Sequence, residues 1–135
     1  MKRGQAAMEY LAVIGFALLM IVPIIFIFFS QSEDITQQLT MNQIREIGRK
    51  VVNTAEKIYY LGEPSQTTLK IYMPNNVEEV NINGRTIVFK IRLNNAPSDL
   101  VFPSTVNLTG NISVQSGIRF IKVKTVAGKV NISDA

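Results

Sequence analysis

The chain of 135 residues contains no cysteine and no histidine. It therefore has no disulfides, no thiol nucleophile, no imidazole base and none of the usual zinc ligands. The lack of cysteine does not indicate a redox compartment, because a chain without thiols is indifferent to it. We also find no nucleophile–base pair, phosphate-binding loop or metal-ligand cluster, and so expect neither catalytic activity nor a cofactor or metal. The adjacent Glu78 and Glu79 are expected to point to opposite faces of a strand, which is poor geometry for acid–base catalysis.

Charge is scarce at the N-terminal end of the chain. The formal net charge is +4, but half of it comes from Lys2 and Arg3. The remainder is too small to suggest a nucleic-acid-binding protein. No charged residue occurs from Tyr10 to Gln31, and residues 11–29 form a dense apolar block.

The apolar block would rise roughly 28 Å as a helix, close to the thickness of a bilayer core. It is apolar on all sides, so lipid or a protein interior must surround it. We favour a membrane-inserted helix over a buried core helix. The block is preceded by the cations Lys2 and Arg3 and followed by the anions Glu33 and Asp34. Because positive charges tend to stay in the cytoplasm, this predicts a cytoplasmic N-terminus, with residues 31–135 outside the membrane.

A cleaved secretory signal peptide is a competing interpretation of the same segment. Its cleavage site would follow the apolar stretch at a pattern of small residues. Residues 27–32 read Ile-Phe-Phe-Ser-Gln-Ser, with bulky groups where small ones are needed. We therefore expect the apolar helix to be retained.

Glu9 is an unusual residue at the entrance to an apolar helix. A carboxylate there is costly unless it stays at the interface or finds a partner. One interpretation is a solvated carboxylate that the helix dipole stabilises near the helix start. The other is a functional pairing residue.

The N-terminal motif resembles the class III signal peptide of archaeal type IV pilins. Lys2-Arg3-Gly4-Gln5, then Glu9 and an apolar run, has that family's spacing, and Gln5 to Leu11 is similar to its Gln-x-x-x-Glu-Tyr-Leu start. The resemblance covers about the first 30 residues. It implies recognition of Lys2 and Arg3 by a prepilin peptidase, and a cut between Gly4 and Gln5.

The same resemblance implies how the processed chain assembles. Glu9 would become the fifth residue and pair with the new ammonium of Gln5 on a neighbouring subunit, in a low-dielectric core. The implied partners are further copies of the chain in a helical filament, an assembly ATPase and a membrane platform protein. The lipid bilayer holds the precursor before assembly, and the filament is extracellular.

After the apolar block, apolar residues recur at helical spacing from Ile35 to Ile58. This pattern predicts an amphipathic helix that stops at Gly62 and Pro64. Residues 5–61 are expected to form one long helix, with a break near residues 30–34 as the open question. Pro23 lies inside the apolar run, where it either kinks the helix with a role in assembly or is tolerated without one.

From Thr67 onward the apolar period is two, which predicts five to seven antiparallel strands in one sheet or small sandwich. Asn83-Gly84 predicts a type I′ hairpin and Ala127-Gly128 a further turn. Pro97 and Pro103 predict an irregular link or edge. The fold class is therefore α+β: a long N-terminal helix, transmembrane and then amphipathic, packed on a C-terminal antiparallel sheet.

The expected organisation has four parts. They are a cleavable leader at 1–4, an apolar helix at 5–30, an amphipathic extension at 31–62 and an external β domain at 63–135.

Three Asn-x-Ser/Thr sequons lie in the predicted β domain, at Asn107, Asn111 and Asn131. The alternation turns each Asn outward and the following apolar residue inward, so N-glycosylation is sterically feasible. A polar β surface rich in Asn and Thr is the alternative.

The patterns, together with the resemblance to archaeal type IV pilins, leave three functions to consider. The first is a structural filament subunit that serves adhesion. The second is a minor pilin or pseudopilin that primes or regulates a related machine, which sequence barely separates from the first. The third is a signal-anchored surface domain that binds a ligand and never polymerises.

Overall fold

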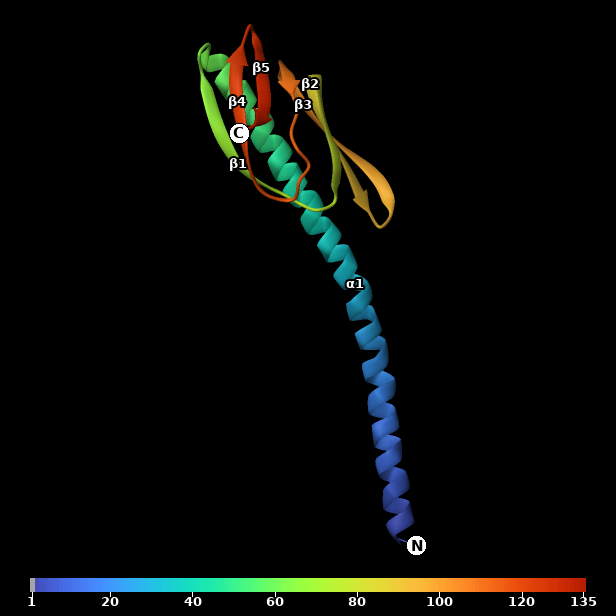
Figure 1. Cartoon of the computed structure of the whole chain (residues 1–135). Helices are drawn as coiled ribbons and strands as arrows, with labels where there is room; N and C mark the ends of the chain where they lie inside the picture. The colour runs from blue at the N-terminus through green and yellow to red at the C-terminus, as the bar shows by residue number, and fades with distance from the viewer. Residues whose placement is uncertain (1) are drawn as a thin grey trace. The chain divides into compact units, whose positions relative to one another are not determined.

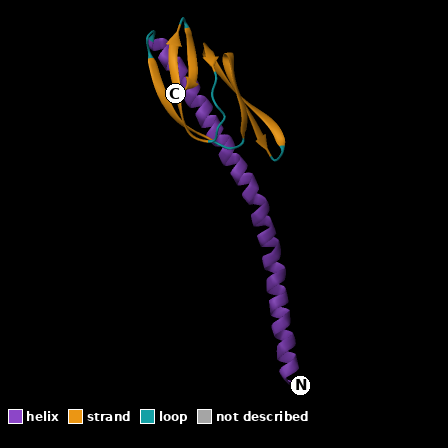
Figure 2. Ribbon diagram, viewed as in Figure 1, coloured by secondary structure: helices purple, strands orange, loops and turns teal. Residues whose placement is uncertain are grey.

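The computed structural model describes the backbone from Lys2 to Ala135 and the side chains from Arg3 onward. Its fold is α+β, as expected, with one helix followed by five strands in this described part (Figures 1 and 2). The chain divides into two compact units, Met1–Gln38 and Leu39–Ala135. The elements are α1 (Lys2–Leu61), β1 (Gln66–Met73), β2 (Val77–Leu93), β3 (Ala96–Gly110), β4 (Gly117–Val126) and β5 (Lys129–Asp134).

Helix α1 runs without interruption from Lys2 to Leu61. It begins three residues before the expected start at Gln5, so the leader from Lys2 is helical too. The possible break at residues 30–34 is absent, and Pro23 lies inside the helix. The helix ends as predicted at Gly62, which adopts φ 78°, a left-handed conformation that glycine takes without steric cost.

The second unit is built on the C-terminal part of α1. Five residues at helical spacing are buried there: Ile44, Ile47, Val51, Ala55 and Ile58. The apolar stripe begins at Ile35 in the sequence, but the β domain buries it only from Ile44 onward. Ile35 and Leu39 are both more than half exposed. Gly48 lets the ring of Phe102 lie against the helix; a Cβ at position 48 would come 2.5 Å from that ring.

The sheet has the strand order β1-β4-β5-β3-β2. It is mixed rather than wholly antiparallel, because β3 and β5 pair in parallel over Leu108–Gly110 and Val130–Ile132. At this seam Gly110 has φ 124°, and an added Cβ would collide with the carbonyl oxygen of Ile132. Glycine is therefore required where the two halves of the sheet meet.

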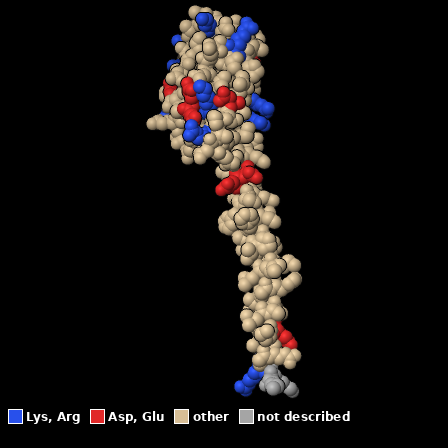
Figure 3. Space-filling view, turned by 90° about the vertical axis from the view of Figure 1, so that its right-hand side faces the viewer, with Lys and Arg blue, Asp and Glu red and all other residues tan. Residues whose placement is uncertain are grey.

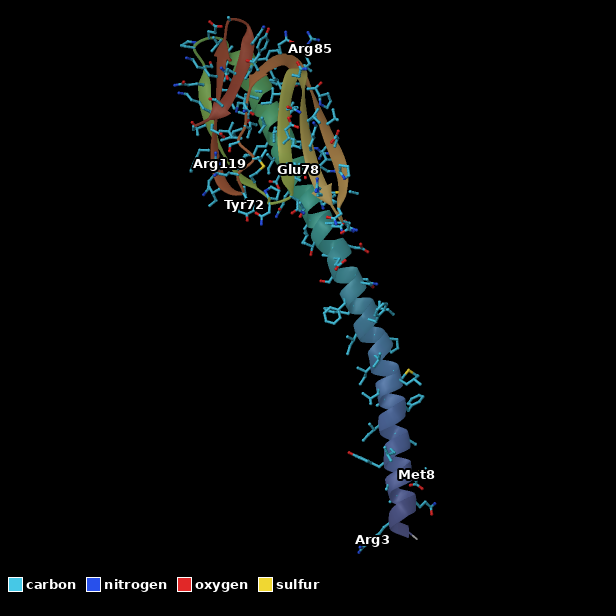
Figure 4. The ribbon with its side chains drawn as sticks, turned by 45° about the vertical axis from the view of Figure 1, so that its right-hand side comes forward. Arg3, Met8, Tyr72, Glu78, Arg85 and Arg119 are labelled. Atoms are coloured by element: carbon cyan, nitrogen blue, oxygen red, sulfur yellow. The ribbon has the colours of Figure 1, made fainter. Side chains whose placement is uncertain are left out.

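Strand β2 folds back on itself. Residues 11 positions apart in a straight strand are about 36 Å apart, yet Lys90 Nζ lies 2.8 Å from Glu79 Oε2. The amide of Arg92 also donates to the carbonyl of Asn76 at 2.9 Å. Figure 4 shows Glu78 and Arg85 toward opposite ends of the first half of this strand. The turn predicted at Asn83-Gly84 is therefore present.

The turn types differ from the prediction at one position. Only Gly84 has positive φ at the first turn, whereas a type I′ turn needs positive φ at both central residues. Asn94 and Asn95 do satisfy that condition, in the two-residue connection from β2 to β3 that the sequence pattern did not indicate. Ala127 and Gly128 satisfy it as well, so the second predicted turn is confirmed.

Pro97 and Pro103 were expected in an irregular link or at an edge. Both lie inside β3 rather than in a link. Leu93 and Ala96 close a two-residue hairpin, so odd-numbered β3 residues direct their amide nitrogens away from β2. Both prolines occupy such positions and remove no bond to β2. Before Leu108 this side of β3 pairs with no strand in the described chain. The prolines therefore mark an open edge, which the sequence did predict.

Candidate functional site

The apolar segment of α1 has no partner within the chain. Its most apolar 18-residue window has a mean hydropathy of 3.0 and none of it is buried. By length and composition, α1 is the one helix in the described part that is apolar enough to cross a membrane. Figure 3 shows a continuous stretch of uncharged side chains along this segment. The segment is thus not a core helix of this chain, and whatever surrounds it must come from outside.

The residues of the predicted cleavage site lie in the first turns of α1. Gly4 and Gln5 are helical and exposed, and an added Cβ at Gly4 would meet nothing within 4 Å. The side chains of Arg3 and Met8 project outward from the helix (Figure 4). The side chain of Lys2, the other predicted leader residue, lies outside the described ones.

Glu9 is exposed and lies about one helical turn beyond Gln5. Its carboxylate makes no ion pair within the described residues of the chain. The structure therefore supplies no internal partner that would balance this charge in lipid. The two interpretations of Glu9 both survive this result, since solvent or a second subunit would each stabilise the carboxylate.

The three sequons have the predicted geometry. Asn107 in β3, Asn111 after it and Asn131 in β5 are exposed. The following residues Leu108, Ile112 and Ile132 are buried. The parallel register places Asn131 beside Thr109 of the first sequon. Two of the acceptor sites thus share one outward face near the β3–β5 seam.

The prediction that Glu78 and Glu79 point to opposite faces is wrong. Both are exposed, and they bind two cations that alternate along the returning half of β2. Arg92 Nε lies 2.7 Å from Glu78 Oε1, and Lys90 Nζ lies 2.8 Å from Glu79 Oε2. Figure 3 shows acidic and basic side chains interleaved on one face of the β domain. Hydrogen bonding by Lys90 lowers the pKa of Glu79, and the same bond raises the pKa of Lys90.

Sequence reasoning missed three side chains of α1 that face the edge of β3: Arg45, Arg49 and Glu56. Glu56 reaches the open edge of β3, where it accepts from Thr105. Arg45 and Arg49 line a groove between α1 and β3. The available signal was the pair of like charges four residues apart on one helix face, which is unfavourable for an isolated helix.

Comparison of the chain with protein-family models, curated proteins and solved structures found no match. Family assignment therefore depends on the N-terminal motif alone. In the described residues no group of three or more acidic side chains is placed to hold a metal ion.

Proposed function

We propose that this chain is the precursor of a structural subunit of a type IV pilus-like surface filament that serves adhesion. A membrane peptidase would cut it between Gly4 and Gln5, and the N-terminal helix would then leave the bilayer and pack against copies of itself. The observation that carries the proposal is the unburied apolar segment of α1 behind a short basic leader.

The energetics of the apolar segment support this function. Fully burying one large apolar side chain is worth about 1.5–3 kcal/mol against water, so a segment this apolar cannot remain in water. In lipid the advantage of helix packing is smaller and depends on close approach of small residues. Ala12, Gly15 and Ala17 offer such sites. The transfer from lipid to filament needs energy from a partner ATPase acting with a platform protein.

The leader is suited to removal. Gly4 lies in the first turns of α1, where the missing Cβ leaves the backbone accessible. Glycine costs a helix about 1 kcal/mol relative to alanine, so this turn opens more easily into the extended form that a protease binds. Cleavage after Gly4 removes Lys2 and Arg3, the cations that hold the N-terminus in the cytoplasm.

The new N-terminus gives Glu9 a partner. Cleavage creates an ammonium at Gln5, four residues before Glu9, whose carboxylate has no ion-pair partner among the described residues. A neighbouring subunit that brings its ammonium to Glu9 would neutralise both charges in an apolar core and fix the axial register of the two helices. The β domain would remain outside the cell, where Asn107, Asn111 and Asn131 are available to a glycosyltransferase.

The variant Gly4→Val tests the assignment of the cut. A branched side chain at the cleaved bond should leave full-length precursor in the membrane and abolish filaments. Arg3→Lys, which keeps the leader's charge and leaves Gly4 unchanged, is the matched control and should be processed normally. Normal filaments from Gly4→Val would refute the cleavage assignment.

Two alternative functions predict different results for the wild-type protein. A minor pilin or pseudopilin would also be cut after Gly4, but would be scarce in purified filaments. A signal-anchored binding domain would keep Met1 and be absent from filaments altogether.

A further inference from the structure

A shallow groove runs between the C-terminal part of α1 and the open edge of β3. Its floor is apolar, formed by the buried side chains Val52 and Phe102. Arg45 and Arg49 line the helix side. Val101, which is 57% exposed, and Pro103 line the strand side. The groove thus combines an apolar base with two cations.

The strand side adds a backbone donor. Odd-numbered β3 residues direct their amides away from β2, and Thr105 demonstrates this, because its amide donates to Glu56 at 2.9 Å. By the same alternation the amide of Val101 points toward the open edge. An occupant of the groove would therefore meet N–H groups from both walls, which favours an anionic occupant.

The two arginines have no acidic partner. Neither Arg45 nor Arg49 makes an ion pair among the residues described. They lie four residues apart on one helix, where like charges repel each other and destabilise the helix. Glu46 lies beside them on the same surface of α1 but forms no ion pair with either among the described residues, so both guanidinium groups are open to an anionic partner.

The chain itself carries a segment with matching chemistry. Glu33 and Asp34 are exposed and make no ion pair within the described part of the chain. Ile35 and Leu39 follow them at 57% and 58% exposure. On α1, Ile35 and Leu39 are four residues apart and share a face, Asp34 lies at the edge of that face, and Glu33 lies on the other side. The segment from Glu33 to Leu39 therefore presents one carboxylate beside two apolar side chains.

We infer that the groove formed by Arg45, Arg49, Val101 and Pro103 binds the segment Glu33–Leu39 of a second copy of this chain. The Asp34 carboxylate would pair with the guanidinium groups, and Ile35 and Leu39 would cover Val101 and the groove floor. Helix neighbours are three or four residues apart, whereas Asp34 and Arg45 are eleven apart, so the pairing is between copies. The inference rests on the proposed filament function and names its lateral contact.

The two surfaces of this contact are different, so the contact is heterologous. A subunit that binds its neighbour through the groove still offers its own Glu33–Leu39 segment to the next subunit. Contacts of this kind produce rings or open helical polymers rather than closed dimers. The contact is therefore of a kind that can build a filament.

Charge reversal tests the contact in cells. Arg45→Glu/Arg49→Glu and Glu33→Lys/Asp34→Lys should each reduce assembled subunits at least about tenfold, since like charges that face each other across an interface cost several kcal/mol. The fourfold variant that combines both reversals restores attraction and should recover filaments. Lys122→Glu/Lys124→Glu makes the same change in net charge as Arg45→Glu/Arg49→Glu, but on exposed positions of β4, and should assemble normally. Full assembly by either reversed pair, or failure of the combined variant, would overturn the contact.

Cross-linking gives a second readout that does not depend on filament yield. The chain has no cysteine, so Asp34→Cys/Arg45→Cys introduces the only two thiols. Oxidation of membranes or filaments should produce a ladder of multimers, because each copy is linked through two different sites. Each single-cysteine variant can form dimers at most. The absence of multimers above dimer would contradict the contact.

These results separate the contact from the proposed function. If wild-type protein starts at Gln5 and forms filaments while the ladder is absent, the contact is wrong and the filament function stands. If wild-type protein keeps Met1 and forms no filaments, the filament function fails. A ladder from such membranes would still support the contact between copies.

Discussion

Glu56 on α1 binds Thr105 on β3 twice through one oxygen: its Oε1 accepts from the amide and from the hydroxyl of Thr105, each at 2.9 Å. The amide belongs to the open side of β3, where no strand pairs with it. The helix carboxylate therefore takes the place of a missing strand. A second bond, from the hydroxyl of Thr125 to the carbonyl of Ile58 at 3.1 Å, fixes the same end of the helix to β4.

Replacing Glu56 by alanine should destabilise the β domain by about 1–2 kcal/mol, because the Thr105 amide loses its acceptor. Chemical unfolding of the full chain in detergent, followed by circular dichroism, measures this. Glu56→Gln keeps an acceptor oxygen and should lose less than Glu56→Ala. Equal losses for the two variants would show that the bond to Thr105 contributes little.

Gly48→Ala should destabilise the chain even though alanine is the better helix former. The substitution gains up to about 1 kcal/mol in helix propensity. An added Cβ, however, comes 2.5 Å from the ring of Phe102, which packs edge-to-face on Phe89 at 5.6 Å. Overpacking of this kind costs about 1–3 kcal/mol, so a net loss is expected in the same unfolding experiment. The control is Asn53→Ala, at an exposed position of the same helix, which should not destabilise the chain.

Glu79 should titrate below its ordinary pKa because it accepts a hydrogen bond from Lys90. A carboxyl whose folded pKa is depressed contributes stability above its unfolded pKa and loses that stability as pH falls through the folded pKa. The pKa of Lys90 is raised, so its contribution to stability is present at lower pH and is lost as pH rises through its folded pKa. Nuclear magnetic resonance titration should show the Glu79 pKa returning toward its ordinary value in Lys90→Gln. An unchanged Glu79 pKa in that variant would assign the shift to another group.

Glu9→Gln should be cleaved normally and yet assemble poorly. In the proposed function the leader and Gly4 are unchanged, so peptidase cleavage would be unaffected, whereas the partner of the Gln5 ammonium would be lost. We expect at least about a tenfold decrease in filaments, equivalent to about 1.4 kcal/mol. Glu9→Asp keeps the charge with a shorter reach and should assemble better than Glu9→Gln. Normal filaments from Glu9→Gln would support the alternative of a merely solvated carboxylate.

Replacing a sequon asparagine by glutamine should lower the mass of the protein by one glycan. This applies to Asn107, Asn111 and Asn131 separately. All three side chains are exposed, so the substitutions should leave the fold intact. Intact-mass analysis of protein from the native surface measures occupancy at each site. An unmodified mass for the wild-type chain would leave the outward face as a polar β surface only.

The parts of the fold that the sequence predicted are those set by local chemistry. The helix end at Gly62 follows from glycine's tolerance of positive φ, and the turn at Ala127-Gly128 from the same property. The outward direction of Asn107 in β3 and Asn131 in β5 follows from strand alternation, whereas Asn111 lies just after the end of β3. The unburied apolar segment follows from a run of residues with no polar side.

The features that the sequence did not predict depend on contacts between distant residues. The parallel seam of β3 and β5 requires Gly110 to approach Ile132, which no local pattern indicates. Pro97 and Pro103 predicted an irregular link or an edge; the edge is present, but the sequence did not indicate that both prolines would lie inside β3, where they are tolerated because one side of the strand is open. The groove with Arg45 and Arg49 exists only once β3 lies beside α1.

Mass spectrometry of the N-terminus of protein purified from the native cell surface tests the central claim most directly. The account predicts a chain that begins at Gln5, recovered from assembled filaments. A mature surface protein with Met1 intact would contradict it.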